Sequence, residues 1–310
     1  VIITFAFLMG TVTIRADILN ALANAQYTQN ATPTELYRLE RSLTSTFGLD
    51  RPLWDRLIQW WIDVPTLDWG YSSAFDKPVL AVLDGRVLTT LEYVIPGLFL
   101  GICFGILAGA WAALDRDGVF DWSARLGSYA VFGVPAFVLA SYGLYFGGYR
   151  IAVPGGFTLV LPVLDPKTIA ALAVGLGLLA GQLRFARTAT LEQTGASFVK
   201  MLRAKGTTRL RLARHVLRNA AIPIVSLSIT ELLSVLVLNI YVLERALDVP
   251  GLGLLSLRAI GVVEGFQFFA VMSDPTLLVW SIMVIVFLGI GLSFLQDVIE
   301  GYLDPRIRAS

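Results

Sequence analysis

A run of 22 residues without a charged side chain, residues 93–114, constrains the fold of this chain more than any other feature. As an α-helix it would be about 33 Å long, enough to cross the roughly 30 Å hydrocarbon core of a bilayer. Hydrophobic residues make up 56% of the chain and charged residues 15%, with a mean hydropathy of +0.71. This composition is too apolar for a soluble domain of 310 residues, so we predict an all-α polytopic membrane protein.

Five other apolar runs bring the expected number of transmembrane helices to six. They cover residues 1–14, 126–149, 168–183, 220–243 and 275–296. The N-terminal run would span only about 21 Å, so we expect a first span whose start is missing. The alternative is a signal peptide cleaved after Ala23 or Ala25. We prefer a retained span, because the orientation derived next needs an inward N-terminus.

The distribution of basic residues predicts the orientation. Residues 184–218 hold nine of the 24 Lys and Arg, and their only acid is Glu192. The positive-inside rule places this segment in the cytoplasm. The turn after Leu114 and both termini then lie inside, and the polar region 17–88 lies outside, between the first two spans. Five spans with a cleaved N-terminus outside remain the alternative. A net charge of only +1, with the bases gathered in one loop, argues against nucleic-acid binding.

The outer region carries strong helix signals. Thr32 and Glu35 form a capping-box pattern with Pro at the first helical position, and Gly48 is an expected C-cap. A second helix should begin after Pro52. Three tryptophans in or after it are candidates for the membrane interface. They are Trp60, Trp61 and Trp69.

Small and polar residues within the spans predict how the helices pack. Gly101, Gly105 and Gly109 recur every fourth residue, a stripe that allows another helix to approach closely. Pro135 predicts a kink, and residues 150–167, rich in Gly and Pro, predict a loop. We expect Arg184 and Arg187, at the end of the fourth span, to snorkel toward the membrane surface.

A basic segment, residues 196–223, is the first candidate functional element. Helical spacing places Phe198, Met201, Leu202 and Lys205 on one face, and Gly206 stands where a left-handed C-cap would end the helix. Such a helix suits docking into a groove of a soluble partner. A basic loop that only sets the topology is the alternative. The residues predicted to contact the partner are Phe198, Lys200, Met201, Leu202, Arg203, Ala204, Lys205 and Gly206.

Glu231 is the second candidate, because a carboxylate near the middle of a bilayer is costly and should face protein or water. Ser228 and Ser234 share its helix face. We expect this face to line a translocation path, and a buried hydrogen bond to a neighbouring helix is the alternative.

Catalytic motifs are absent from the sequence. It has no phosphate-binding loop, so we expect no ATP hydrolysis by this chain and do not expect an enzyme. The single Cys103 and the single His215 lack the companions that a metal site requires, and no cofactor is expected. The Gly175 and Gly177 pair resembles a dinucleotide pattern, but it lies inside a span, where we expect helix packing.

Several segments together resemble a known family. Arg203-Ala204-Lys205-Gly206 and the later run from Arg214 to Pro223 resemble the cytoplasmic loop of ABC-importer permeases of the dipeptide, oligopeptide and nickel type. The outer region, the sequence Pro250-Gly251-Leu252-Gly253 and the tail from Tyr302 to Arg308 are similar to the same family. ABC importers generally have Glu-Ala-Ala where this chain has Lys200-Met201-Leu202. This difference bears on which ATPase the chain pairs with, and not on the family that it resembles.

The resemblance implies a type I ABC importer permease fold. Its parts would be a first span (1–16), an extracellular helical insertion (17–88) and a core (89–310) with a cytoplasmic coupling loop (188–219). It implies one half of a path for peptides, a second related permease, two ABC ATPases that bind ATP and Mg²⁺, and an extracytoplasmic binding protein in a prokaryotic plasma membrane. Import of oligosaccharide or nickel is the alternative, as is a membrane receptor or structural protein without transport.

Overall fold

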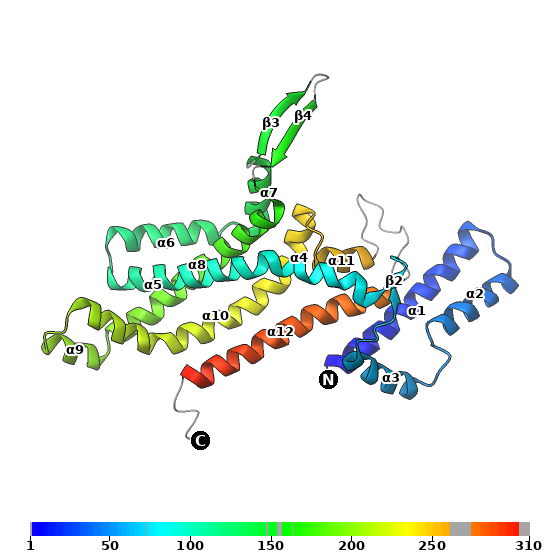
Figure 1. Ribbon diagram of the computed structural model, residues 1–310, viewed down its shortest axis with the longest axis horizontal. Coiled ribbons are helices and arrows are strands. Elements are labelled where there is room, and N and C mark those ends of the chain that lie inside the picture. Colours follow the sequence, from blue (N-terminus) through cyan, green and yellow to red (C-terminus); the bar gives the residue numbers. More distant parts are fainter. Residues whose placement is uncertain are drawn as a thin grey trace. The chain divides into compact units, whose positions relative to one another are not determined.

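The computed structural model describes residues 2–72, 74–146, 148–153, 157–162, 164–260 and 274–303, which are mostly helical (Figure 1). They fall into two compact units. Unit 1 comprises Val1–Val87 with Leu255–Val286, and unit 2 comprises Leu88–Leu254 with Phe287–Ser310. The helices α4 (Val79–Phe99), α11 (Leu252–Ala259) and α12 (Pro275–Leu303) each contribute residues to both units.

Unit 1 begins with α1 (Ile2–Thr28), which continues well beyond the uncharged N-terminal run. The helices α2 (Pro33–Thr46) and α3 (Leu53–Thr66) follow, and β1 (Tyr71–Ser72) pairs with β2 (Lys77–Pro78). The capping box is confirmed, since the Thr32 backbone N–H donates to Glu35 Oε2 at 2.7 Å and the Glu35 N–H donates to Thr32 Oγ1 at 3.4 Å. Gly48 has the expected positive φ, +62°.

Aromatic stacking organises the interior of unit 1. Trp280 on α12 stacks on Trp60 at 4.5 Å and on Trp69 at 4.6 Å between ring centroids. Trp60 and Trp69 thus pack on a tryptophan that is distant in sequence, and their place at a membrane interface stays a prediction. Trp61 is 46% exposed, as an anchor would be. Asp274 caps α12 through the Leu277 N–H at 2.9 Å and also accepts from the Ser72 hydroxyl at 2.6 Å.

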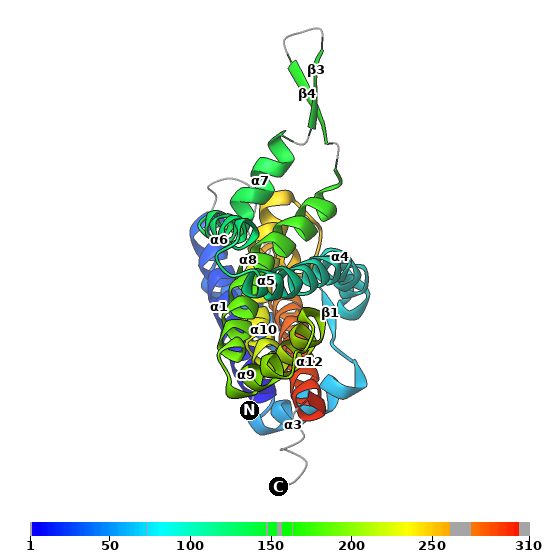
Figure 2. The same ribbon diagram turned by 90° about the vertical axis from the view of Figure 1, so that its left-hand side faces the viewer.

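Unit 2 is built around α8 (Pro166–Thr194). The end of α4, a π-helical turn η1 (Leu100–Phe104) and α5 (Gly105–Leu114) pack along it, as Figures 1 and 2 show. The glycine stripe is confirmed as a packing face. A Cβ at Gly105 would lie 2.6 Å from Gln182 Cβ, and one at Gly97, a fourth member of the stripe, would lie 2.8 Å from the Ala171 carbonyl oxygen.

The kink predicted at Pro135 is confirmed, because α6 (Val119–Phe132) and α7 (Ala136–Phe146) meet at 88° where this proline removes a backbone donor. The expectation of a loop at residues 150–167 needs correction. These residues contain most of an antiparallel hairpin of β3 (Gly148–Val153) and β4 (Phe157–Pro162), with Arg150 opposite Val160. The β-branched residues before and after the sequence Pro154-Gly155-Gly156 favour the two strands.

Within the described residues, four helical stretches are long and apolar enough to cross a membrane. They are Ile3–Thr28, Val79–Leu114, Pro166–Thr194 and Pro275–Ile299, and the bent pair α6–α7 would make five. The remaining expected span lies in α10 (Arg209–Leu247), a helix of 39 residues that continues through Pro223. The count of six spans stays a prediction, as does the outer location of residues 17–88.

Candidate functional site

The basic segment forms a short helix, α9 (Ser197–Ala204), between α8 and α10. After its last turn, the Lys205 N–H donates to the Met201 carbonyl at 3.1 Å and the Thr207 N–H to the Leu202 carbonyl at 3.2 Å. Gly206 has a φ of +69°, so the expected left-handed C-cap is confirmed. The chain then turns into α10, whose N-cap is Thr208.

The two faces of α9 differ in exposure. Val199, which the sequence analysis did not single out, is 1% exposed and anchors the helix, while Phe198 and Leu202 are half-buried. Met201 is 53% exposed, and its exposed neighbours include two lysines. The exposed face is made of Lys200, Met201, Ala204 and Lys205. The Arg203 side chain lies outside the described part of the structure. An apolar thioether between ammonium groups suits contact with a partner surface that is apolar at its centre and acidic at its edge.

The helices on either side of α9 form a tight frame. Ala186 and Ala189 of α8 form a buried cluster with Ala220 and Ile224 of α10, and Ile106 of α5 packs against it. Small side chains bring the helix backbones close together, so this cluster holds α8 against α10.

A buried ion pair joins α6 to α8 near the end of α8 that leads into α9. Asp121 is fully buried and accepts from Arg187 Nε at 2.5 Å and from a terminal guanidinium nitrogen of Arg187 at 2.9 Å. The Asp117 N–H adds a bond to Asp121 at 3.1 Å. Arg187 thus does not snorkel as expected, and Arg184 lies over the Phe132 ring, with 4.0 Å from its guanidinium carbon to the ring centroid. A bidentate pair is the geometry that best offsets the burial of a carboxylate.

A second buried carboxylate lies at the other end of unit 2. Glu244, at the end of α10, is fully buried. Its Oε1 accepts from the hydroxyls of Thr90 at 2.7 Å and Tyr93 at 3.0 Å, and its Oε2 accepts from the Leu254 N–H at 2.9 Å. A Cβ at Gly251 would overlap Glu244 Oε1, which explains a glycine at this point of the Pro-Gly-Leu-Gly sequence. This carboxylate ties the turn into α11 to α4 and α10.

The two ion pairs of α8 are separated by about the thickness of the hydrocarbon core of a membrane. Lys167, in the first turn of α8, forms an ion pair with Glu92 at 2.5 Å, and Arg187 lies twenty residues further along the same helix. At 1.5 Å per residue this separation is about 30 Å, the thickness of the hydrocarbon core. The glycine stripe packs on α8 between these two positions.

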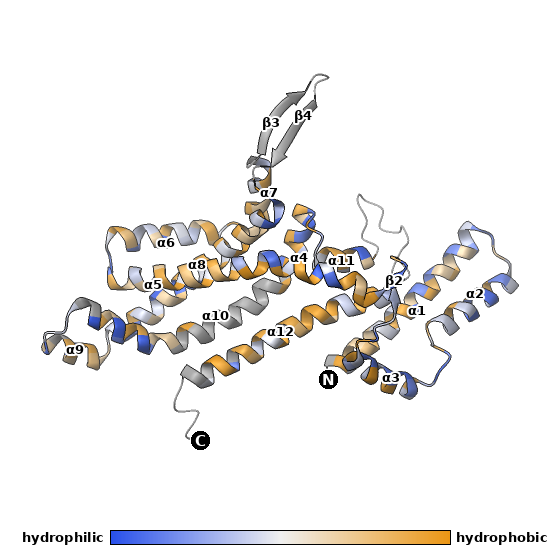
Figure 3. Cartoon of the chain, in the orientation of Figure 1, coloured by the Kyte–Doolittle hydropathy of each residue, from blue (hydrophilic) through white to orange (hydrophobic). Residues whose placement is uncertain are grey.

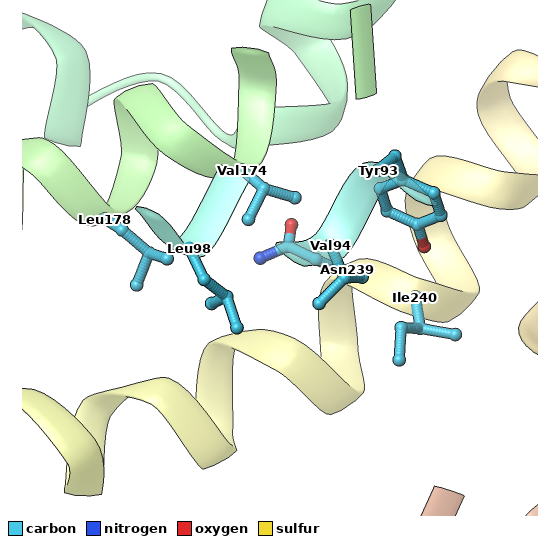
Figure 4. A pocket seen from close by; sticks show the side chains of 7 residues that line it. All are labelled: Tyr93, Val94, Leu98, Val174, Leu178, Asn239 and Ile240. Atoms are coloured by element: carbon cyan, nitrogen blue, oxygen red, sulfur yellow. The ribbon is translucent and has the colours of Figure 1, made fainter. Parts of the chain in front are cut away.

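In the described ranges no three His, Cys, Asp or Glu side chains come together as metal ligands. Ser228, Glu231 and Ser234 lie in α10, but their side chains are outside the described part of the structure. Figure 4 shows a nearby cavity whose lining includes Tyr93, Val174 and Asn239. Its volume of about 10 Å³ admits one water molecule.

Sequence reasoning missed both buried carboxylates. Asp121 and Arg187 are 66 positions apart, and Thr90 and Glu244 are 154 apart. One signal was present in the sequence: each carboxylate lies within a few residues of an apolar run. An ionisable residue at such a place in a membrane protein pairs with another group or takes part in function.

These features define a polytopic helical membrane protein with a short, exposed helix at one end of its core. Residues 101–309 match the family described as the inner membrane component of binding-protein-dependent transport systems. The match covers more than half of the chain, and the chain belongs to this family.

Individual relatives agree with this assignment. A putative peptide permease protein of Brucella suis is 28% identical over 279 residues, covering 87% of this chain and 84% of the relative. The dipeptide transport system permease protein of Bacillus subtilis is 27% identical over 277 residues, with the same coverage of 87% and 84%. A chain of the MetNI methionine ABC transporter, solved in inward-facing conformations, has the same fold. Its TM-score is 0.54 at 21% identity, and the likeness covers 73% of this chain and 98% of that one.

Proposed function

We propose that the chain is the permease subunit of an ATP-driven importer and forms half of a path for di- and oligopeptides. The peptide permeases of Brucella suis and Bacillus subtilis, which it matches over most of their length, support this substrate class. A second related permease would complete the path, and an extracytoplasmic binding protein would deliver the peptide. Two ABC ATPases would bind ATP and Mg²⁺ and perform the hydrolysis, so the chain itself is not an enzyme.

The observation that carries the mechanism is the exposed face of α9 on a helix anchored by Val199. In this mechanism α9 docks into a groove of an ATPase subunit. Closure of the ATPase pair on ATP displaces α9, and the frame of α8 and α10 tilts with it as a rigid body. The residues assigned to the contact are those predicted from the sequence, Phe198, Lys200, Met201, Leu202, Arg203, Ala204, Lys205 and Gly206.

The topology belongs to the same proposal. Six spans place both termini and residues 188–219 in the cytoplasm and residues 17–88 outside, with 1–16 as the first span and 89–310 as the core. The contacts in unit 2 support it, because Asp121, just beyond the turn after α5, pairs with α8 near the α9 end. The separation of about 30 Å between the ion pairs of α8 also supports it.

Within the core, we assign the face of Ser228, Glu231 and Ser234 to the translocation path. A carboxylate there would meet the cationic or polar groups of a peptide. Replacing Glu231 by Gln removes the charge and keeps the shape, so uptake of peptides with a free amino group should fall in a complex that assembles normally. Unchanged uptake of every peptide would contradict this role.

Gly206→Val tests the docking role. A β-branched residue is strained at a φ of +69°, and a Cβ at this position meets nothing of this chain within 4 Å, so the strain lies in the backbone of the α9 C-cap. Gly48 is a matched control, because it has a φ of +62° and is equally open, but it lies in the outer region. In proteoliposomes with the ATPases and binding protein, Gly206→Val should retain ATP hydrolysis and lose coupled peptide uptake, whereas Gly48→Val should keep both.

Wild-type uptake by Gly206→Val would refute the docking role. The substrate class is tested separately, by measuring whether nickel or oligosaccharide, and not peptide, stimulates ATP hydrolysis with the cognate binding protein. A chain that copurifies with no ATPase would favour a receptor or structural protein.

A further inference from the structure

Unit 1 contains a cavity that transport coupling does not use. It has a volume of about 230 Å³ and is lined by α1, the α2–α3 link, α3 and the first turns of α12. Four aromatic residues, Phe7, Phe47, Trp60 and Trp280, line its apolar wall. A volume of this size accommodates a phosphate ester or a comparable small polar group, but not a whole peptide.

Two positive groups in the wall lack negative partners. Arg56 donates to Thr11 Oγ1 at 3.0 Å and lies over the Phe7 ring at 5.5 Å, yet no carboxylate of the described residues is within ion-pair distance of it. Arg51 also lines the cavity. Burial and the positive charge of Arg15 lower the pKa of Arg56. An anion in the cavity would relieve both effects.

The indole of Trp60, a residue of the cavity wall, also lacks an acceptor among the residues that the structure describes. Its Nε1 is buried and has no hydrogen-bond partner in the described part of the chain. A buried donor left without an acceptor costs about 1–3 kcal/mol. Asp63 is the one acid in the cavity wall, and it accepts from the Gln59 amide at 2.7 Å. Among the described residues, the cavity wall therefore carries two guanidinium groups against a single carboxylate, beside an indole N–H that has no acceptor.

The cavity lies where polar and apolar parts of unit 1 meet. It adjoins the first turns of α12, at the start of the candidate span Pro275–Ile299. Gly10 of α1 packs on Val279 there, where an added Cβ would lie 3.1 Å from the valine side chain. Arg15 and Asp274 mark the beginning of the charged region on α1 and before α12. The boundary between an apolar span and a charged region is where lipid headgroups are expected.

The outward face of α3 supports the same location. Trp54, Ile58, Trp61 and Ile62 are 71%, 59%, 46% and 50% exposed, and they recur at helical spacing. Figure 3 shows apolar residues interspersed with hydrophilic ones along this helix. An exposed tryptophan-rich face on a helix next to membrane spans is typical of helices that lie in the bilayer interface.

We propose that this cavity binds the phosphate of an anionic phospholipid, with Arg56 and the Trp60 indole as donors. The acyl chains then lie along the exposed apolar side chains of α1, among them Phe5, Leu8 and Met9, while α3 rests in the headgroup layer. A lipid of net negative charge is favoured over a zwitterionic one, because the two arginines face only one acid.

The test is native mass spectrometry of the intact permease complex in detergent, titrated with phosphatidylglycerol or with phosphatidylcholine. Arg56→Gln should weaken binding of the first phosphatidylglycerol by about tenfold, as expected for one charge-assisted hydrogen bond. Phosphatidylcholine, whose choline adds a positive charge, should bind the wild type more weakly than phosphatidylglycerol does. Arg41→Gln, the same charge change at an exposed α2 position away from the cavity, is the control and should bind as wild type.

Trp60→Phe tests the second donor independently, because it removes the N–H and keeps the ring that stacks on Trp280. It should weaken binding of phosphatidylglycerol several-fold, and Arg56→Lys, which retains the charge, should weaken it less than Arg56→Gln. Equal phosphatidylglycerol binding by Arg56→Gln and Arg41→Gln would overturn the proposal. Displacement of the lipid by millimolar inorganic phosphate, or by a dipeptide with a free carboxylate, would also overturn it and assign a soluble anion to the site.

Discussion

A pair of glycine substitutions on facing helices should change stability in opposite directions. Gly105 faces α8, and an added Cβ would lie 2.6 Å from Gln182 Cβ and 3.0 Å from the Leu179 carbonyl oxygen. Carbon atoms in contact normally stand about 3.5–4.0 Å apart, so the helices would have to separate by roughly 1 Å. Gly177 is on α8 itself, but a Cβ there meets nothing within 4 Å.

The magnitudes follow from two opposing effects. Replacing a glycine inside a helix by alanine gains about 0.5–1 kcal/mol, because the unfolded chain loses conformational freedom. Overpacking a tight contact costs about 1–3 kcal/mol. Gly105→Ala should therefore destabilise the protein by about 1–2 kcal/mol, whereas Gly177→Ala should stabilise it by about 0.5–1 kcal/mol.

Reversible unfolding in mixed micelles, followed by far-ultraviolet circular dichroism as the SDS fraction rises, measures both variants. The expected difference between them, about 1.5–3 kcal/mol, is a 10- to 100-fold difference in the unfolding equilibrium. Equal stability of the two variants would refute the claim that the glycine stripe holds α5 against α8. A stabilised Gly105→Ala would refute it more strongly.

Three further changes test the polar contacts. Asp121→Asn should destabilise unit 2 by about 3–5 kcal/mol in the same assay by leaving Arg187 buried without a counter-charge, and replacing both residues by leucine should cost much less. Glu244→Gln should cost less than Glu244→Leu, because the Gln oxygen still accepts from the Leu254 N–H and its amide can donate to the hydroxyl oxygens, whereas leucine leaves all three donors without a polar partner and should cost several kcal/mol. The Thr32 bonds hold the pKa of Glu35 below 4.5, so the stability that they add to α2 is complete above pH 4.5 and is lost as the pH falls through the lowered value. Hydrogen exchange at the first turn of α2, compared between pH 6 and pH 3, measures this loss, and equal protection at both pH values would contradict it.

Local signals in the sequence predicted the elements that depend on neighbouring residues. The capping box at Thr32, the left-handed glycines Gly48 and Gly206, and the glycine stripe all concern residues within a few positions of one another. The physical causes are backbone hydrogen bonds, backbone strain and side-chain volume. Each is fixed by residue type and spacing alone.

The features that sequence reasoning missed depend on tertiary contacts. The stacking of Trp60 on Trp280, the pairing of Asp121 with Arg187 and the anchoring of Glu244 join residues that are far apart in the chain. No periodicity marks such partners. The hairpin after α7 was missed for another reason, since Gly and Pro at its centre outweighed the alternation on either side.

The contacts of α8 explain how a small surface helix could move a membrane core. Ion pairs about 30 Å apart join α8 to α4 at one end and to α6 at the other, and the glycine stripe joins it to α5 along its length. Bending α8 would break a buried ion pair or open a contact with no spare volume, and either change costs several kcal/mol. Rotating α4, α5, α6 and α8 together as one rigid body preserves both the ion pair and the packing contact. The energetically favourable response to a force on α9 is thus a rigid tilt of this group of helices, and bending is left to segments that these contacts do not hold, such as the break at Pro135 between α6 and α7.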